Sequence, residues 1–92
     1  MPQHIRQRVI YTGRVQGVGF RAGVRGIASG YSVSGYVRNQ DDGTVELVVD
    51  GPASAVEQCV SAVQDRFSRN IQRADSTPIS GGEPLTGFTI RW

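Results

Sequence analysis

A glycine-rich segment near the start of the chain restricts the fold more than any other feature. The segment Gly13-Arg14-Val15-Gln16-Gly17-Val18-Gly19-Phe20-Arg21 follows a short apolar run and leads into a stretch with helical spacing. Glycines let backbone N–H groups turn towards one point, because no side chain blocks the approach. The guanidinium of Arg21, at the helix start, can hold a tetrahedral oxyanion beside those amides. The sequence therefore predicts a phosphate-binding loop between a strand and a helix.

The length of 92 residues allows one domain and not a doubly wound dinucleotide-binding fold. We expect a single domain over residues 1–92, with residues 1–7 as a flexible N-terminus. No apolar run of about 18 residues is present, so we expect no membrane span. The N-terminus lacks the apolar core of a signal peptide, and the single cysteine, Cys59, cannot form an internal disulfide. These features favour a cytoplasmic protein, and a monomer is the default expectation.

Hydrophobic periodicity predicts the elements of the first half. Residues 8–15 are expected to form a strand, and residues 21–31 a helix with one apolar face. Residues 36–39 form the next predicted strand. Turn residues at 39–43 join it to a return strand in which Val45, Leu47 and Val49 alternate, so this region is predicted to be a β-hairpin.

The second half continues with a helix, an irregular polar stretch and a last strand. Gly51-Pro52 opens the helix, with Ser54 and Glu57 at capping-box spacing. Its apolar stripe consists of Val56, Cys59, Val60, Val63 and Phe67. Within the polar residues 68–86 a weak edge strand is expected at Ile71–Ala74, and residues 88–92 alternate as a final strand. The order β-α-β-β-α-β predicts an α+β, ferredoxin-like sandwich with two helices on one face of a mostly antiparallel sheet.

Three glycines lie within the first predicted helix, at positions 23, 26 and 30. Each weakens an exposed helix by up to about 1 kcal/mol relative to alanine. If Gly23 has helical backbone angles, its replacement by alanine is expected to stabilise the protein.

Two other phosphate motifs fit the glycine loop poorly. Gly17-x-Gly19-x-x-Ala22 matches a loose dinucleotide-binding pattern, with Asp41 about 20 residues later. That acid, however, lies in a predicted hairpin turn, and the chain is too short for a second mononucleotide-binding half. The nucleoside-triphosphate loop requires a lysine, and the chain contains none.

The sequence indicates no metal site and no cofactor. Asp41 and Asp42 are adjacent acids in a glycine-containing turn, where such residues are usually solvated. The only histidine, His4, lies in the predicted flexible terminus, and Cys59 lies on a predicted apolar stripe outside the phosphate loop. A covalent cysteine mechanism would require that thiol inside the loop.

The motif Gly13–Arg21, followed by Gly35-Tyr-Val-Arg-Asn39 and Asp42-Gly-Thr-Val-Glu46, resembles the acylphosphatases over essentially the whole chain. These are small, metal-free enzymes that hydrolyse the carboxyl–phosphate bond of acyl phosphates, releasing inorganic phosphate. The resemblance implies that Arg21 binds the phosphate and that Asn39 positions the attacking water. It further implies that backbone amides complete the phosphate site, contributed by Gln16, Gly17, Val18, Gly19 and Phe20.

The chemistry of an acyl phosphate agrees with this set of residues. Its carboxylate leaving group needs little protonation, so no strong general acid is required. Amides and Arg21 can stabilise the charge of an in-line transition state. Asn39 can orient a water but is too weak a base to take its proton, so a phosphate oxygen of the substrate is the expected acceptor.

Two other function classes stay open. One is a non-catalytic phosphate- or acyl-phosphate-binding module, since acylphosphatase-like domains also occur inside larger proteins. The other is a nucleic-acid-binding ferredoxin-like domain, for which Tyr11 and Tyr36 are the candidate stacking residues. Ten scattered arginines and a net charge of +2 give that reading little support, so we expect no nucleic-acid partner.

Overall fold

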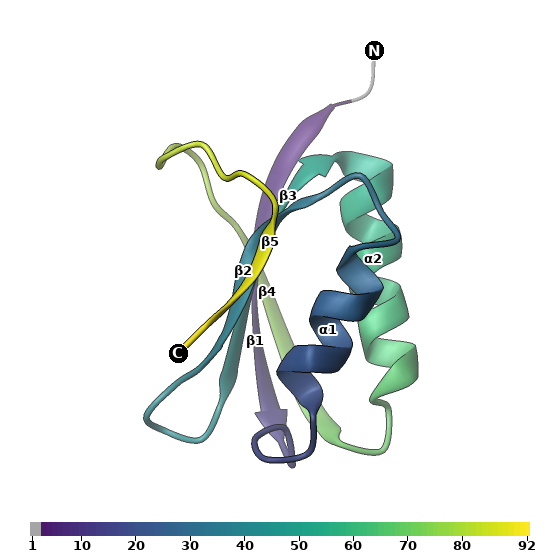
Figure 1. Cartoon of the computed structure of the whole chain (residues 1–92), viewed down its shortest axis with the longest axis vertical. Helices are drawn as coiled ribbons and strands as arrows, with labels where there is room; N and C mark the ends of the chain where they lie inside the picture. Colours follow the sequence, from purple (N-terminus) through teal and green to yellow (C-terminus); the bar gives the residue numbers. More distant parts are fainter. Residues whose placement is uncertain (1–2) are drawn as a thin grey trace.

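The computed structural model describes residues 3–92 and shows one sheet covered by two helices. Both helices lie on the same side of the sheet (Figure 1). The elements in chain order are β1 (His4–Gly13), α1 (Phe20–Ala28), β2 (Ser34–Asn39), β3 (Val45–Pro52), α2 (Ala53–Arg66), β4 (Ile71–Pro78) and β5 (Phe88–Arg91).

The sheet has the strand order β4-β1-β3-β2-β5. All neighbouring strands run antiparallel except β2 and β5, which run parallel. The predicted ferredoxin-like fold is therefore confirmed, with β4 completing the β-α-β-β-α-β order and β5 added beyond β2. The weak edge strand predicted at Ile71–Ala74 extends to Pro78, because its backbone pairs with β1 from Gln7 to Gly13.

The prediction that residues 1–7 form a flexible terminus is wrong for residues 4–7, and Met1 and Pro2 lie outside the described residues. Strand β1 begins at His4, where the pairing with β3 starts opposite Pro52. Ile5 packs against the core, while Arg6 makes hydrogen bonds on the other face of the sheet. The strand ends at Gly13, earlier than the predicted residue 15.

The hydrophobic core lies between the sheet and the helices. Tyr11, Phe20 and Phe67 form its aromatic centre. The ring centroid of Phe20 lies 5.3 Å from that of Tyr11 and 4.6 Å from that of Phe67. The predicted apolar stripe of α2 is confirmed, since Val56, Cys59 and Val63 are fully buried and Val60 packs against the core. Because α1 and α2 cover one face only, the other face of the sheet carries mainly polar and charged side chains, together with Ile10, Tyr36 and the buried Val48.

The helix boundaries differ from the predicted ones. Helix α1 ends at Ala28 and not at residue 31. The predicted capping box is wrong: Pro52 is the N-cap of α2, with no side-chain cap hydrogen bond, and Ser54 lies inside the helix. The packing reverses the expectation for Gly23→Ala from stabilising to destabilising, because a Cβ at this position would overlap the ring of Phe67.

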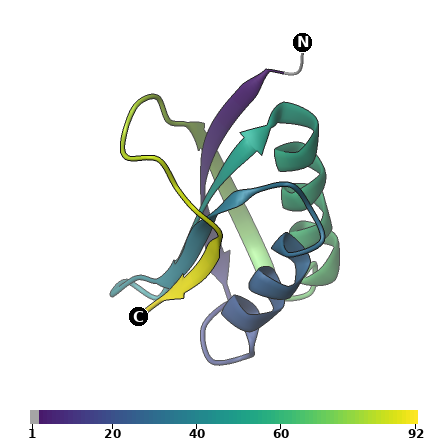
Figure 2. The same cartoon turned by 45° about the horizontal axis from the view of Figure 1, so that its top comes forward.

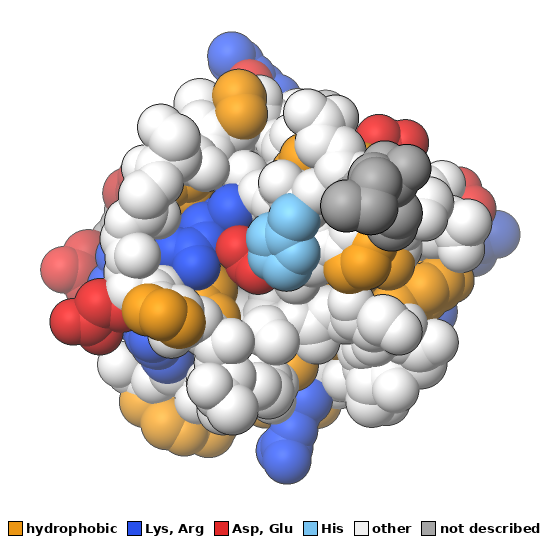
Figure 3. Space-filling model, turned by 90° about the horizontal axis from the view of Figure 1, so that it is seen from above, with side chains coloured by type: hydrophobic (Ala, Val, Ile, Leu, Met, Phe, Trp, Pro, Cys, Tyr) orange, Lys and Arg blue, Asp and Glu red, His pale blue; other side chains and the backbone are white. Residues whose placement is uncertain are grey.

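The loop between β4 and β5 runs over the side of the sheet away from the helices (Figure 2). Arg6 holds it there: Nη1 donates to the carbonyl of Gly81 at 3.2 Å and Nη2 to that of Glu83 at 2.9 Å. Nε of the same side chain donates to Asp50 at 2.8 Å, and His4 Nε2 lies 2.6 Å from the other oxygen of that carboxylate. In Figure 3 the molecule is seen from above, with the histidine beside acidic and basic side chains.

Candidate active site

The glycine-rich segment forms a loop that leads directly into α1. Gly17 and Gly19 have φ angles of 78° and 76°, in the left-handed region that favours glycine, and Gly19 is the N-cap of α1. A Cβ at either position would meet nothing within 4 Å. The backbone conformation at these two positions therefore favours glycine. The space beside the loop is open.

A cavity of about 150 Å³ lies beside this loop. It is lined by the loop, the start of α1, the end of β2 and the C-terminal strand, through Val15, Gly17, Gly19, Phe20, Arg21, Ala22, Asn39, Ile90 and Trp92. The structure thus brings together five of the predicted site residues, although Arg21 and Asn39 come from different elements. Gln16 and Val18 do not line the cavity.

Arg21 reaches the cavity with its charge unneutralised. Among residues 3–92 its guanidinium forms no ion pair with a carboxylate, and no acidic side chain of that range lines the cavity. Its Nη1 donates to the carbonyl of Arg91 at 3.4 Å, and its Cζ lies 4.1 Å from the ring centroid of Trp92. A cation stacked on an aromatic ring keeps most of its N–H groups free for an anion.

Asn39 presents a buried acceptor atom. It is the last residue of β2 and pairs with Val45 at the start of β3. Its Oδ1 is buried and has no hydrogen-bond partner among the described residues. Buried polar atoms are nearly always hydrogen-bonded, so this oxygen is suited to accept from a water or a ligand.

The side chain of Gln16 ties the loop to the β2–β3 hairpin, a role that sequence reasoning missed. Its Nε2 donates to the carbonyl of Gln40 at 2.8 Å and to that of Thr44 at 2.9 Å. These acceptors flank the turn that begins next to Asn39. The glycine loop and Asn39 are thereby held in one relative position. Only the backbone amide of Gln16 could be singled out from the sequence, because nothing local indicates a contact over 24 to 28 residues.

Arg38, the neighbour of Asn39, points to the opposite face of the sheet. Its Nε donates to Glu46 Oε1 at 2.6 Å, and Arg8 Nε donates to Oε2 of the same carboxylate at 2.6 Å. Burial by itself raises the pKa of Glu46, but the hydrogen bonds and charges of the two arginines outweigh it and lower that pKa below its usual 4.5. The charge of Arg38 is therefore engaged away from the cavity.

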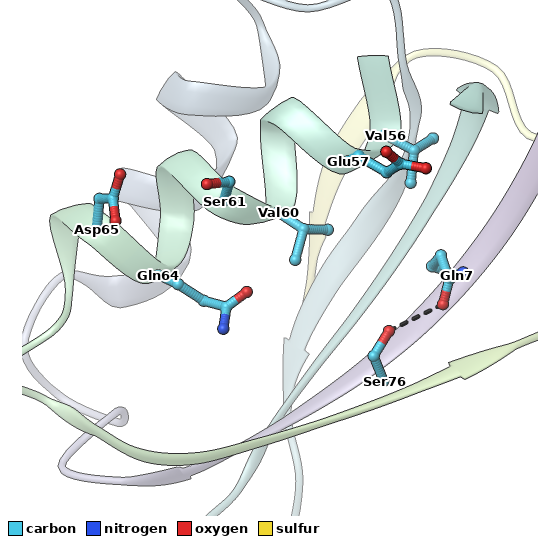
Figure 4. Close-up of a pocket in the computed structure, with 8 residues that line it drawn as sticks. All are labelled: Gln7, Val56, Glu57, Val60, Ser61, Gln64, Asp65 and Ser76. Atoms are coloured by element: carbon cyan, nitrogen blue, oxygen red, sulfur yellow. Dashed lines mark hydrogen bonds between the residues drawn. The ribbon is translucent and has the colours of Figure 1, made fainter. Parts of the chain in front are cut away.

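A larger groove of about 380 Å³ runs between α2 and the edge of the sheet and contains none of the predicted site residues (Figure 4). Its charged side chains are Glu57 and Asp65, and a hydrogen bond of 2.8 Å joins Ser76 to Gln7 across its floor. Acidic walls repel a phosphate, so the glycine-loop cavity is the better anion site.

Within residues 3–92, no helix is both long enough and apolar enough to cross a membrane. No three histidine, cysteine, aspartate or glutamate side chains in that range lie together as metal ligands.

An unpaired arginine, a glycine loop at a helix start and a buried amide oxygen around one cavity define a site suited to a phosphate and a water. A sequence model of the acylphosphatase family matches residues 7–90. An acylphosphatase of Caldivirga maquilingensis is 39% identical over 94 residues, covering 100% of this chain and 99% of its own.

Solved structures give the same result. The crystal structure of acylphosphatase from Bacillus subtilis superimposes with a TM-score of 0.87 at 37% identity, covering 96% of this chain and 99% of its own. The structure of an acylphosphatase from Coxiella burnetii gives a TM-score of 0.82 at 26% identity, covering 96% of this chain and 93% of its own. The chain belongs to the acylphosphatase family, a family of hydrolases that act on acyl phosphates.

Proposed function

We propose that this protein hydrolyses the carboxyl–phosphate bond of acyl phosphates, producing a carboxylate and inorganic phosphate. One observation carries the proposal: the guanidinium of Arg21, which has no carboxylate partner within residues 3–92, and the Oδ1 of Asn39, which has no hydrogen-bond partner there, belong to the same small cavity beside the glycine loop. An anion and a water are the groups that these two side chains lack.

The phosphoryl group is held by the loop and by Arg21. The backbone amides of residues 16–20 surround it at the N-terminus of α1, where the helix dipole and free N–H groups favour negative charge. The left-handed glycines at 17 and 19 leave room for this approach. Arg21 adds a full positive charge to the phosphoryl oxygens, which matters most as charge develops in the transition state.

Asn39 positions the attacking water through its Oδ1. The water oxygen bonds to phosphorus in line with the acyl oxygen, the phosphorus–oxygen bond to the acyl group breaks, and the carboxylate leaves with its electron pair. One water proton stays on the attacking oxygen and the other passes to a non-bridging phosphate oxygen. The described lining of the cavity holds no side chain that titrates near neutral pH, so the substrate itself is the proton acceptor.

The remaining expectations belong to the same proposal. The reaction requires no metal and no cofactor, because the leaving group is already activated. The protein is proposed to be a cytoplasmic monomer whose partners are a small acyl phosphate and the phosphate product. Nucleic-acid binding gains no support from the two candidate tyrosines: Tyr11 is fully buried in the core, and the Cζ of Arg91 lies 3.7 Å from the ring centroid of Tyr36.

The test is hydrolysis of benzoyl phosphate in the presence of a chelator. The wild-type protein is expected to hydrolyse benzoyl phosphate. In Arg21→Ala and in Asn39→Ala, kcat is expected to fall by about 100-fold or more, the loss typical of removing one group that stabilises the transition state. Asn39→Ala should still bind inorganic phosphate by calorimetry, whereas Arg21→Ala should not. Arg25→Ala, which removes an exposed arginine one turn later in α1 and outside the cavity, is the matched control.

Two outcomes oppose the proposal. A wild type that binds phosphate but never hydrolyses benzoyl phosphate is a binding module. A rate that follows an enzyme group titrating near neutrality, and not the ionisation of the substrate, rules out the substrate as proton acceptor.

A further inference from the structure

The cavity beside the glycine loop is too small to enclose an acyl phosphate with a large acyl group. Its volume is about 150 Å³, below the roughly 300 Å³ of pockets that enclose a drug-sized ligand. Once the phosphoryl group lies against the loop amides and Arg21, most of a large acyl group such as benzoyl must lie at the mouth. The side chains at the mouth therefore contact the acyl group.

The mouth carries an exposed tryptophan. The side chain of Trp92 lines the cavity and is 93% exposed, while the other large apolar side chains of the cavity, Phe20 and Ile90, are buried or half-buried. An indole ring left in water retains the full area that burial would remove from solvent. A ligand that covers this ring recovers that free energy.

Trp92 also lies beside the phosphate site. The Cζ of Arg21 lies 4.1 Å from the ring centroid, so one face of the indole is stacked on the guanidinium that is proposed to bind the phosphoryl group. The acyl group is attached directly to that phosphoryl group. The remaining ring surface lies within reach of it.

The charges of the side chains that line the cavity further restrict which acyl groups can bind. In the described part of the chain, Arg21 is the one charged side chain of the cavity, and the phosphoryl group uses it. Among the described residues, a carboxylate on the acyl group would find no second cationic side chain in this lining, and an ammonium group would find no acidic side chain. The apolar side chains of the lining that are not fully buried, and so can contact the acyl group, are Ala22, Ile90 and Trp92.

We propose that Trp92 forms an acyl-group platform that makes the protein selective for acyl phosphates with uncharged, apolar and above all aromatic acyl groups. This inference rests on the proposed function, because that function identifies the substrate as an acyl phosphate. Binding of an apolar group to Trp92 can nevertheless be measured without any hydrolysis. A flat aromatic ring stacks on the indole, whereas an acetyl group is too small to cover it.

The decisive experiment compares two stable phosphonates that cannot be hydrolysed, benzylphosphonate and methylphosphonate, by calorimetry. Wild type is expected to bind benzylphosphonate about 3- to 10-fold more tightly, the ratio that corresponds to one aromatic pair. Trp92→Ala should abolish this preference, and Trp92→Phe should retain part of it. Trp92 is the only tryptophan, so quenching of its fluorescence by benzylphosphonate gives an independent readout in wild type.

The control is Tyr36→Ala, which removes an arginine–aromatic stack from the opposite face of the sheet and should leave both affinities unchanged. An equal loss for both phosphonates in Trp92→Ala overturns the proposal, because Trp92 would then act only by orienting Arg21. Equal affinities in wild type overturn it as well.

Measured rates of hydrolysis distinguish a failure of this proposal from a failure of the proposed function. The ratio of kcat/KM for benzoyl phosphate over acetyl phosphate should fall in Trp92→Ala by the same 3- to 10-fold, about one aromatic contact. A wild type that hydrolyses neither substrate refutes the proposed function, while the phosphonate comparison still decides whether Trp92 is a platform.

Discussion

Gly23 of α1 packs directly against the ring of Phe67, at the point where α1 and the end of α2 meet. A Cβ at position 23 would overlap Cζ of that ring and lie 2.9 Å from its Cε2. Phe67 is held in turn by Phe20, with ring centroids 4.6 Å apart, so it has little room to withdraw. The two helices approach closely because this position has no side chain.

Gly23→Ala is therefore expected to lower the free energy of unfolding by about 1–3 kcal/mol, the usual cost of overpacking a core. Gly26→Ala is the matched control in the same helix, where a Cβ meets nothing within 4 Å. That variant should gain up to about 1 kcal/mol from helix propensity. Urea denaturation of both proteins checks the pair, and a stabilised Gly23→Ala would contradict the packing described here.

Gln16→Ala is expected to separate the glycine loop from the β2–β3 hairpin. It removes one of two hydrogen bonds from each of the carbonyls of Gln40 and Thr44, which still accept from the backbone N–H groups of Gly43 and Gln40, at a cost of about 0.5–1.5 kcal/mol in stability per bond. Displacement of the loop relative to Asn39 should also lower kcat/KM for benzoyl phosphate by about 10- to 100-fold. Gln58→Ala, an exposed glutamine on α2, is the control. Unchanged activity in a destabilised Gln16→Ala would mean that this amide only stabilises the fold.

Glu46→Gln tests the carboxylate that joins Arg8 and Arg38. The folded state lowers the pKa of Glu46 below 4.5, so its stabilising effect is present above pH 4.5 and is lost as the pH falls through the folded value. At pH 7 the variant should be less stable by about 1–2 kcal/mol, since both arginines are partly exposed and solvent weakens the pair.

The difference between wild type and Glu46→Gln should shrink below pH 4.5, measured by urea denaturation at a series of pH values. Glu57→Gln on the exposed side of α2 should change stability by less than about 0.5 kcal/mol throughout. A difference that persists unchanged at low pH would show that the ionised form of Glu46 is not what stabilises the fold.

Cys59 is expected to react with thiol reagents only when the protein unfolds. The side chain is fully buried in the core, and burial raises the pKa of its thiol from 9.0 to about 11. Because the folded pKa is the higher one, the associated stability is lost as the pH rises above about 9. Modification by a disulfide reagent at pH 8 should match the unfolding rate, and fast labelling without denaturant would place Cys59 outside the core.

Most of the fold could be predicted because its signals are local. The alternation of Val45, Leu47 and Val49 indicates a strand, and the stripe of α2 from Val56 to Phe67 indicates a buried helix face; both are confirmed. Strand β4 was underestimated because its residues are mostly exposed and polar, and its length is set by backbone pairing with β1. The start of β1 was missed for the same reason.

The sequence by itself determined the presence of a glycine loop before a helix, the order of the elements and the candidate residues Arg21 and Asn39. The loop and the elements depend on backbone preferences and hydrophobic periods within short windows, whereas the roles of Arg21 and Asn39 were implied by the motifs that resemble the acylphosphatases. Only the tertiary structure decided that Trp92 stacks on Arg21, that Gln16 binds the hairpin and that Phe67 excludes a side chain at Gly23. These contacts join residues far apart in the chain, and their geometry is set by how the helices and the sheet pack around one core.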